Sequence, residues 1–276
     1  MAAEPVISHI AVMVDASDRQ RPVLDVAMEL AINLRARLSG LLVPDQLLVR
    51  ALDFPYTQYV SSALASVVTM DRHMLDAHLS AVADRLQKLL ESRAKADMLS
   101  FSLRVEKDPA EIPHDADLLI TRATSANVLQ TRQLLTELQA ASGAGGRGLL
   151  LLRNDDPATP ISVPVKSLSP ATWQRIVWAA RMAKGLRRPL RLVIERSSLT
   201  PGDLTAWLQE SAAESQGEQG PSGIASVIIA SAPTANTGAG LLAVDLSDMS
   251  VQESGSLLTR SSASLLVLNL DRPAPR

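Results

Sequence analysis

Residues 7–14, ISHIAVMV, decide how the rest of the sequence is interpreted. The run is apolar and rich in β-branched residues, and it ends at Asp15, where a polar turn follows. These features predict a buried β-strand. From Arg21 onward, apolar residues recur at spacings that place them on one face of a helix. Residues 37–43, RLSGLLV, are then predicted to form a second strand, so this part of the chain reads strand, helix, strand.

The same pattern returns later in the chain with almost constant register. One extra residue in the turn before the helix is the only shift. The matched segments are 161–165 with 10–14, 176–186 with 24–34, and 190–194 with 38–42. A strand, a helix and a strand repeated in one order indicate an internal duplication.

Both copies are expected to end alike. We interpret 117–121 (DLLIT) and 226–230 (SVIIA) as buried fourth strands, each followed by a helical stretch. The last apolar runs are 148–152 (GLLLL) and 265–270 (LLVLNL). Alternating strands and helices with continuously apolar strands predict parallel sheets that helices cover on both faces.

The two copies meet at 154–160, NDDPATP, where prolines and acidic residues interrupt the pattern. We therefore predict an α/β protein with two doubly wound domains, 1–155 and 156–276. The first domain carries an insert at about 44–100. The later part of this insert has a helical period, with apolar residues at Leu75, Leu79, Val82, Leu86 and Leu89 or Leu90.

Composition excludes several classes of function. The hydrophobic share is 46% but aromatic residues are only 3%, so the core must consist of Leu, Val, Ile and Ala. A net charge of −2 gives no electrostatic reason to expect nucleic acid or a membrane as partner. The absence of cysteine excludes disulfides, thiolate nucleophiles and cysteine metal sites. We expect a cytoplasmic protein, since no apolar run is long enough to span a membrane.

Catalytic and metal-binding patterns are not visible. His73 and His78 are five residues apart, whereas metal-ligand pairs on helices are usually separated by three or four. His9 and His114 have no partner at such a spacing. No serine has a histidine and an acid recognisably arranged around it, and a triad assembled only in space would leave no such pattern. We expect no enzymatic activity.

Three stretches resemble the universal stress proteins. IAVMVDAS with the following LDVAMELAINLRARLSGLLV is similar to the start of such a domain, and VWAARMAKGLRRPLRLVI is similar to it again. LLTRSSASLLVLNL resembles the closing helix and strand of the family. The chain thus resembles a tandem universal stress protein over most of both copies.

The resemblance implies five-stranded, mainly parallel sheets in each domain. It also implies that the last strands of the two domains pair antiparallel, which would make the chain an internal pseudo-dimer. GLLLL and LLVLNL are the strands expected to form this pair. The resemblance leaves open whether the chain is a monomer with this internal pair or a homodimer.

In the nucleotide-binding branch of the family, an acidic residue ends the first strand and contacts the nucleoside. Asp15 matches this position in the first copy, whereas Lys166 occupies it in the second. The branch also has a loop after the fourth strand, with two glycines three residues apart and a later glycine followed by serine or threonine. Those glycines let backbone amides approach phosphate closely.

Neither copy keeps this glycine pattern. The candidate positions in the first copy are Arg122 and Ser125, and those in the second are Ser231, Thr234 and, for the later hydroxyl, Ser250. The residues leave two functions open. The first is a non-catalytic, stress-associated regulatory or interaction protein that binds an unidentified protein partner and no cofactor. The second is an adenine-nucleotide sensor that binds ATP or AMP through Asp15 and a rearranged loop.

Overall fold

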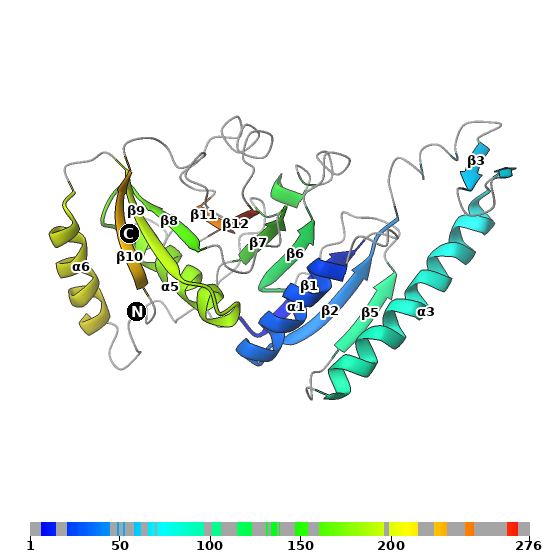
Figure 1. The fold of residues 1–276 in the computed structure, drawn as a ribbon, viewed down its shortest axis with the longest axis horizontal. Coiled ribbons are helices and arrows are strands. Elements are labelled where there is room, and N and C mark those ends of the chain that lie inside the picture. Colours follow the sequence, from blue (N-terminus) through cyan, green and yellow to red (C-terminus); the bar gives the residue numbers. More distant parts are fainter. Residues whose placement is uncertain are drawn as a thin grey trace.

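The computed structural model describes residues 7–14, 21–44, 49, 52, 58–61, 66–69, 71–96, 101–105, 115–122, 131, 134–136, 138, 147–153, 160–195, 199–214, 224–230, 241–245 and 264–269. Within these ranges, ten strands form one continuous sheet (Figure 1) in the order β10-β9-β8-β11-β12-β7-β6-β1-β2-β5. The fold is therefore α/β, as predicted.

The first half of the chain supplies β1 (His9–Val14), β2 (Arg37–Leu42), β5 (Phe101–Val105), β6 (Leu118–Arg122) and β7 (Arg147–Leu152). The second half supplies β8 (Ile161–Val165), β9 (Leu190–Glu195), β10 (Ile224–Ala230), β11 (Leu241–Asp245) and β12 (Ser264–Asn269). Within each half all neighbouring strands are parallel. Each half is thus a five-stranded parallel sheet with the same strand order.

The two halves join through β7 and β12, which pair antiparallel from Leu265 opposite Leu151 to Asn269 opposite Arg147. This confirms the expected pairing of GLLLL with LLVLNL. The pair removes two apolar edges that would otherwise be exposed. Because the sheet continues through both halves, the division into separate domains near residue 155 stays a prediction.

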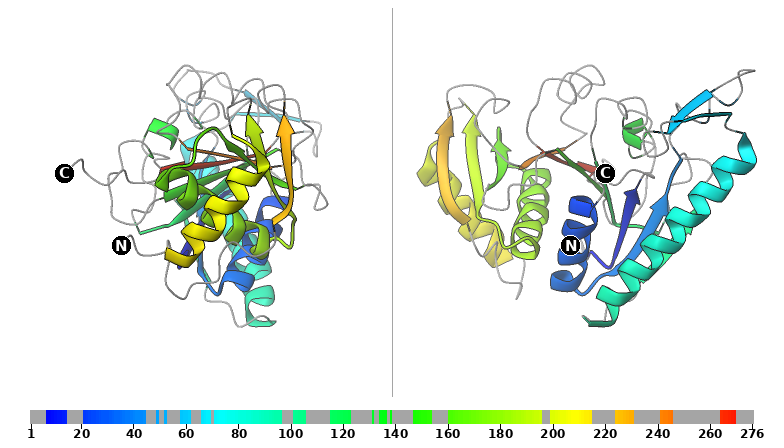
Figure 2. Two further views of the ribbon diagram at one scale, coloured as in Figure 1. Left: turned by 90° about the vertical axis from the view of Figure 1, so that its left-hand side faces the viewer. Right: turned by 45° about the vertical axis from the view of Figure 1, so that its right-hand side comes forward.

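Helices α1 (Arg21–Leu34) and α5 (Pro170–Gly185) pack side by side over the middle of one sheet face (Figure 2). Ser169 caps α5 by accepting a hydrogen bond from the amide of Thr172, and Pro170 follows the cap. The Asn33 side chain donates to the carbonyl of Gly185, at 2.6 Å, and so links the ends of the two helices.

The core alternates between the two faces of the sheet, as the strand period requires. Ile10, Val12 and Val14 face α1 and α5 in one apolar cluster that extends through both halves. Ala11 and Met13 face the opposite side, in a second cluster with Leu134, Leu135 and Leu138 among others.

Helix α3 (Arg72–Ala96) lies against β5. Helix α6 (Pro201–Glu214) is its counterpart in chain order, because it follows β9 and precedes β10 as α3 follows β2 and precedes β5. Leu75, Leu79 and Leu90 of α3 are buried, as the apolar period predicted. The insert expected at about 44–100 therefore includes a helix that has a counterpart in α6, and the first half is longer mainly at 43–71, where the second half has only 196–200. The segment 43–71 contains a separate hairpin of β3 (Gln58–Ser61) and β4 (Ser66–Thr69), which the sequence did not predict.

The assignment of SVIIA at 226–230 as the fourth strand of the second half was wrong. This segment is β10, which pairs with β9 at one end of the sheet, whereas β11 lies beside β8 in the place that β6 has beside β1. Both segments are short apolar runs, and such runs do not reveal whether a strand is central or at an edge. Ser231 and Thr234 consequently follow the third strand of the second half in chain order, not the fourth.

Candidate functional site

The strand order creates two places where a ligand is expected. Parallel α/β sheets bind ligands outside the carboxyl ends of their strands, where the direction of the strand order reverses. In the first half this switch point lies between β1 and β6, and in the second half it lies between β8 and β11. These two carboxyl edges are the candidate sites.

Of the predicted site residues, the structure describes Arg122 alone. It ends β6 at the first switch point and is half-buried. The other candidates, which are Asp15, Ser125, Ser231, Thr234 and Ser250, lie outside the described residues.

Arg122 has ordinary strand geometry at the position where the nucleotide-binding pattern requires its first glycine. It is paired with Leu152 in the ladder between β6 and β7. Among the described residues other than glycine, positive φ angles occur at Arg35 and Arg187 and not at Arg122. The backbone here therefore lacks the glycine conformation that brings amides close to a phosphate.

Arg153 lies next to Arg122 at the same edge, because it follows Leu152. Its amide donates to the Ser264 hydroxyl at 2.9 Å, across the joint between the halves. Partial burial lowers the pKa of the Arg153 guanidinium from its usual value. Arg122 thus ends β6 and Arg153 follows β7 at the first carboxyl edge, and sequence analysis missed Arg153 because its place depends on the pairing of β6 with β7.

The second carboxyl edge has different residues at the matching places. Lys166 follows β8 directly and is exposed, at the position of Asp15 in the repeat. Leu241 pairs with Ile161 as Leu118 pairs with Ile10, so Asp245 at the end of β11 is the counterpart of Arg122. Pro164 in β8 has no amide hydrogen, and the pairing with β11 ends at Ser162.

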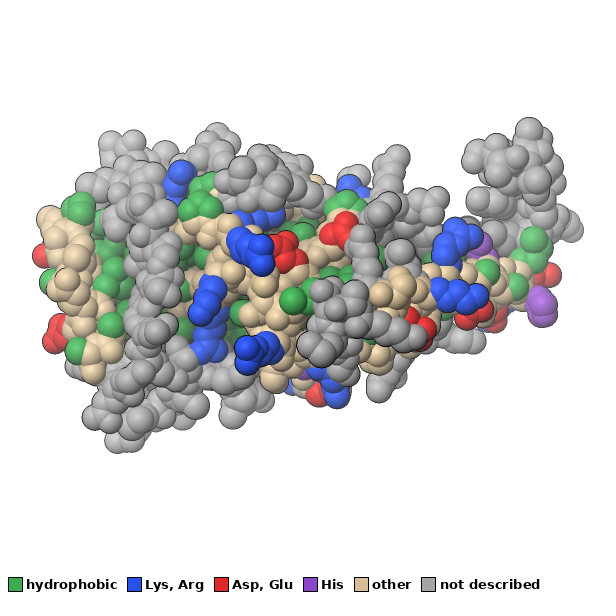
Figure 3. Space-filling view, turned by 60° about the horizontal axis from the view of Figure 1, so that its bottom comes forward, with side chains coloured by type: hydrophobic (Ala, Val, Ile, Leu, Met, Phe, Trp, Pro, Cys, Tyr) green, Lys and Arg blue, Asp and Glu red, His purple; other side chains and the backbone are tan. Residues whose placement is uncertain are grey.

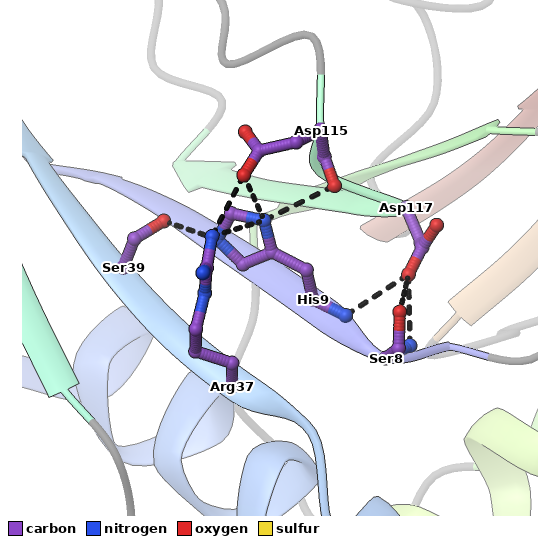
Figure 4. A network of polar contacts seen from close by, with 6 residues as sticks. All are labelled: Ser8, His9, Arg37, Ser39, Asp115 and Asp117. Carbon is purple, nitrogen blue, oxygen red and sulfur yellow. Dashed lines mark hydrogen bonds and ion pairs between the residues drawn. The ribbon is translucent and has the colours of Figure 1, made fainter.

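A polar network lies at the opposite, amino edge of the first half (Figure 4). The His9 ring is buried where β1 begins, with its Nε2 atom 2.8 Å from the Ser39 hydroxyl of β2. Its Nδ1 atom lies 3.1 Å from the carbonyl oxygen of Asp115 and 3.2 Å from the Asp115 carboxylate. Arg37 donates to the same carboxylate at 2.7 Å.

Asp117 fixes the backbone of this network. One of its carboxylate oxygens accepts hydrogen bonds from the Ser8 amide and hydroxyl, both at 2.8 Å, and from the His9 amide at 2.9 Å. For the exposed Asp115 carboxylate, slight desolvation raises the pKa, but attraction to His9 and Arg37 and its hydrogen bonds outweigh this, so its pKa is lowered overall. The sequence did not reveal the network, because its members come from three separate segments.

The histidines of α3 show no site. His73 and His78 are both exposed on that helix. Among the described residues, no group of three or more acidic or histidine side chains is placed to hold a metal ion. Within the same ranges, no helix is long and apolar enough to cross a membrane.

The basic residues near the end of α5 differ in exposure. Lys184 and Arg187 are exposed, whereas Arg188 is buried. On the face shown in Figure 3, lysine and arginine side chains form separate groups with other polar and acidic side chains between them. The described side chains on that face therefore form no continuous basic patch.

Comparison of the whole structure with solved structures places it among known folds. It is similar to a protein classed with the universal stress proteins from Pseudomonas aeruginosa UCBPP-PA14, with a TM-score of 0.57, 14% identity, and coverage of 96% of this chain and 94% of that one. The fold is that of the universal stress proteins.

Two further structures agree. A universal stress protein from Archaeoglobus fulgidus DSM 4304 has a TM-score of 0.54 and 12% identity, with coverage of 94% of this chain and 95% of that one. A protein of unknown function from Pseudomonas aeruginosa PAO1 has a TM-score of 0.59 and 14% identity, with coverage of 98% and 95%. No protein-family model matches the sequence, and no curated protein matches it either.

Proposed function

We propose that this protein is a non-catalytic, stress-associated regulatory or interaction protein of the universal stress protein type, with nucleotide sites that no longer hold ATP. The observation that carries the proposal is Arg122. It ends β6 as an extended, paired strand residue at the position of the first phosphate-loop glycine. A side chain there occupies the space that a phosphate needs beside the backbone.

The second half supports the same conclusion for independent reasons. Lys166 replaces the acidic residue that contacts the nucleoside in the nucleotide-binding branch. Asp245 has the chain position that Arg122 has in the first half, so this copy also lacks a glycine there.

A role in protein interaction is supported by the difference between the two halves. Helix α3 has 25 residues and α6 has 14, although both join the second and third strands of their half. At about 1.5 Å per residue, α3 is longer by roughly 16 Å. Its extra length carries it, with the β3–β4 hairpin, beyond the end of the sheet (Figures 1 and 2). We infer that this extension contacts a protein partner.

The second candidate is an adenine-nucleotide sensor, and the place of Arg122 at the end of β6, beside the first switch point, favours it. Arginine side chains bind phosphate oxygens in place of backbone amides. In this version Asp15 contacts the nucleoside, and Arg122 at the end of β6 holds a phosphate.

Calorimetric titration of the purified chain with Mg-ATP separates the two candidates. If the protein is an interaction protein, titration with Mg-ATP up to about 1 mM gives no saturable heat. Any binding of ATP is then weaker than a dissociation constant of about 1 mM, which corresponds to a binding free energy of about −4 kcal/mol. The sensor binds in the micromolar range, and Asp15→Ala and Arg122→Ala each weaken that binding. The matched control is Arg147→Ala, which alters an arginine at the amino end of β7, away from the carboxyl edge. Micromolar binding by the unmodified chain contradicts the first proposal.

A further inference from the structure

Ser39, His9 and Asp115 are arranged in the order of a nucleophile, a base and an orienting acid. The Ser39 Oγ atom is 2.8 Å from His9 Nε2, and His9 Nδ1 is 3.2 Å from the Asp115 carboxylate (Figure 4). Hydrogen bonds in this order allow the imidazole to remove the serine proton while the carboxylate stabilises the resulting charge.

The neighbours of His9 select the tautomer that this role requires. Nδ1 faces two acceptors, the carbonyl and carboxylate oxygens of Asp115, at 3.1 and 3.2 Å. The Arg37 guanidinium can only donate hydrogen bonds. It lies farther from Nδ1, at 3.4 Å, and donates instead to the Asp115 carboxylate at 2.7 Å. We therefore assign the proton to Nδ1, which leaves Nε2 free to accept the proton of Ser39.

Ser39, His9 and Asp115 differ in exposure. Ser39 and His9 are buried, at 7% and 6% relative exposure, whereas the Asp115 side chain is 63% exposed. Ser39 is paired with Ser102 of β5, the strand at the end of the sheet, and Ser102 is exposed. The burial of Ser39 restricts the proposed reaction to small acyl groups, and the exposed Ser102 on β5 marks the side of the sheet nearest to solvent.

We propose that Ser39 is a site of covalent acylation by small activated acyl donors, such as aryl esters or thioesters. A bond forms between Ser39 Oγ and the acyl carbon as the bond from that carbon to its leaving oxygen or sulfur breaks. The Ser39 proton passes to His9 Nε2 and then to the leaving group. No atom is oxidised or reduced in this acyl transfer, and no other reactant is required.

We expect one acylation event and no efficient turnover. The amides of β2 take part in ladders with β1 on one side and β5 on the other, so they do not form an oxyanion hole. Reaction is therefore limited to donors with good leaving groups, and the acyl-serine persists. The modification lies at the amino edge and is independent of nucleotide binding at the carboxyl edge.

The test uses the full chain with p-nitrophenyl acetate as the probe. The expected result is a burst of about one p-nitrophenolate per chain, a mass increase of one acetyl group, and peptide mapping of that group to Ser39. Ser39→Ala and His9→Gln abolish the burst. Ser102→Ala is the matched control, because Ser102 is more exposed but forms no hydrogen bond to a described histidine, and it leaves the burst unchanged.

Asp115 acts as a positioning residue, so its test must separate geometry from stability. Asp115→Asn slows the burst about tenfold or more, and Asp115→Glu recovers part of the rate while both keep the melting temperature of the parent. A folded parent chain that acquires no acetyl group on Ser39 overturns the proposal. Acetylation of Ser39 that persists unchanged in a folded His9→Gln variant overturns it as well.

Discussion

Gly148 lies where both halves of the sheet and a helix of the second half come close to one another. It lies on β7 and is paired with Leu268 of β12 and Leu118 of β6. A Cβ atom at Gly148 would lie 3.0 Å from Leu118 Cδ1, 3.3 Å from Leu268 Cδ2 and 3.3 Å from Trp178 Cζ3. We predict that Gly148→Val destabilises the whole chain, since these neighbours belong to three different elements.

The expected loss of stability in Gly148→Val follows from overpacking of the core. Extra methyl groups in a well-packed core cost about 1–3 kcal/mol, and valine adds two beyond the Cβ atom that is already tight. We expect the upper part of this range, about 2–3 kcal/mol, which corresponds to a decrease of roughly 3–5 °C in melting temperature for a chain of this size. Urea unfolding and thermal unfolding both measure it.

A double-mutant cycle with Trp178→Phe tests the geometry directly. Trp178 is 1% exposed, and its Nε1 atom has no hydrogen-bond partner in the described part of the chain. Phenylalanine removes both the ring atom that faces Gly148 and the unpaired donor. The double variant is expected to be more stable than the sum of the single changes by about 1 kcal/mol.

Gly202→Ala is the control, because its new Cβ atom would meet only Thr200 Oγ1, at 3.6 Å. It should leave stability unchanged or raise it by up to about 1 kcal/mol, since alanine favours a helix over glycine. Additivity of Gly148→Val and Trp178→Phe within about 0.3–0.5 kcal/mol would refute the packing of α5 onto β7.

Two further predictions concern hydrogen-bonded carboxylates. Asp117→Ala removes the acceptor for the Ser8 amide, the Ser8 hydroxyl and the His9 amide, so urea unfolding should show a loss of about 1–3 kcal/mol; unchanged stability would contradict this role. Hydrogen bonds from the backbone and side chain of Thr200 lower the pKa of Asp203. Since the folded-state pKa lies below the unfolded one, its stabilisation is present at neutral pH and is lost as pH falls through the folded pKa. The melting-temperature difference between the parent and Asp203→Asn should therefore shrink on acidification, and a constant difference from pH 7 to pH 2 would show that Asp203 does not contribute in this way.

The sequence was sufficient for the repeated units and for the joint between them. Residues 10–14 and 161–165 are continuously apolar because they form central strands with helices or apolar side chains on both faces. The resemblance to the universal stress proteins, and not the apolar character of these runs, correctly matched 148–152 and 265–270 as an antiparallel pair.

The order of the third and fourth strands in the second half was not available from the sequence. SVIIA and LLAVD have similar length and apolar character, although one lies at an end of the sheet and the other beside β8. The counterpart of Arg122 was therefore sought at Ser231 and is found at Asp245. Only the observed strand pairing shows which strand lies beside β8, because the place of a strand in a sheet is decided by tertiary contacts.

The polar network was missed for a similar reason. His9, Ser39 and Asp115 are distant in the sequence and have no common spacing. They come together because β1 lies between β2 and β6, so the amino ends of these strands, or the residues just before them, are neighbours. A sequence pattern can detect side chains on one helix or strand, but it does not detect groups that meet across three strands.

Native mass spectrometry of the freshly purified chain shows whether both carboxyl edges have lost nucleotide binding. With excess Mg-ATP added and then removed by brief buffer exchange, we expect only the mass of the 29.5 kDa chain. A species heavier by one or two adenine nucleotides, lost on Asp15→Ala substitution, would contradict it.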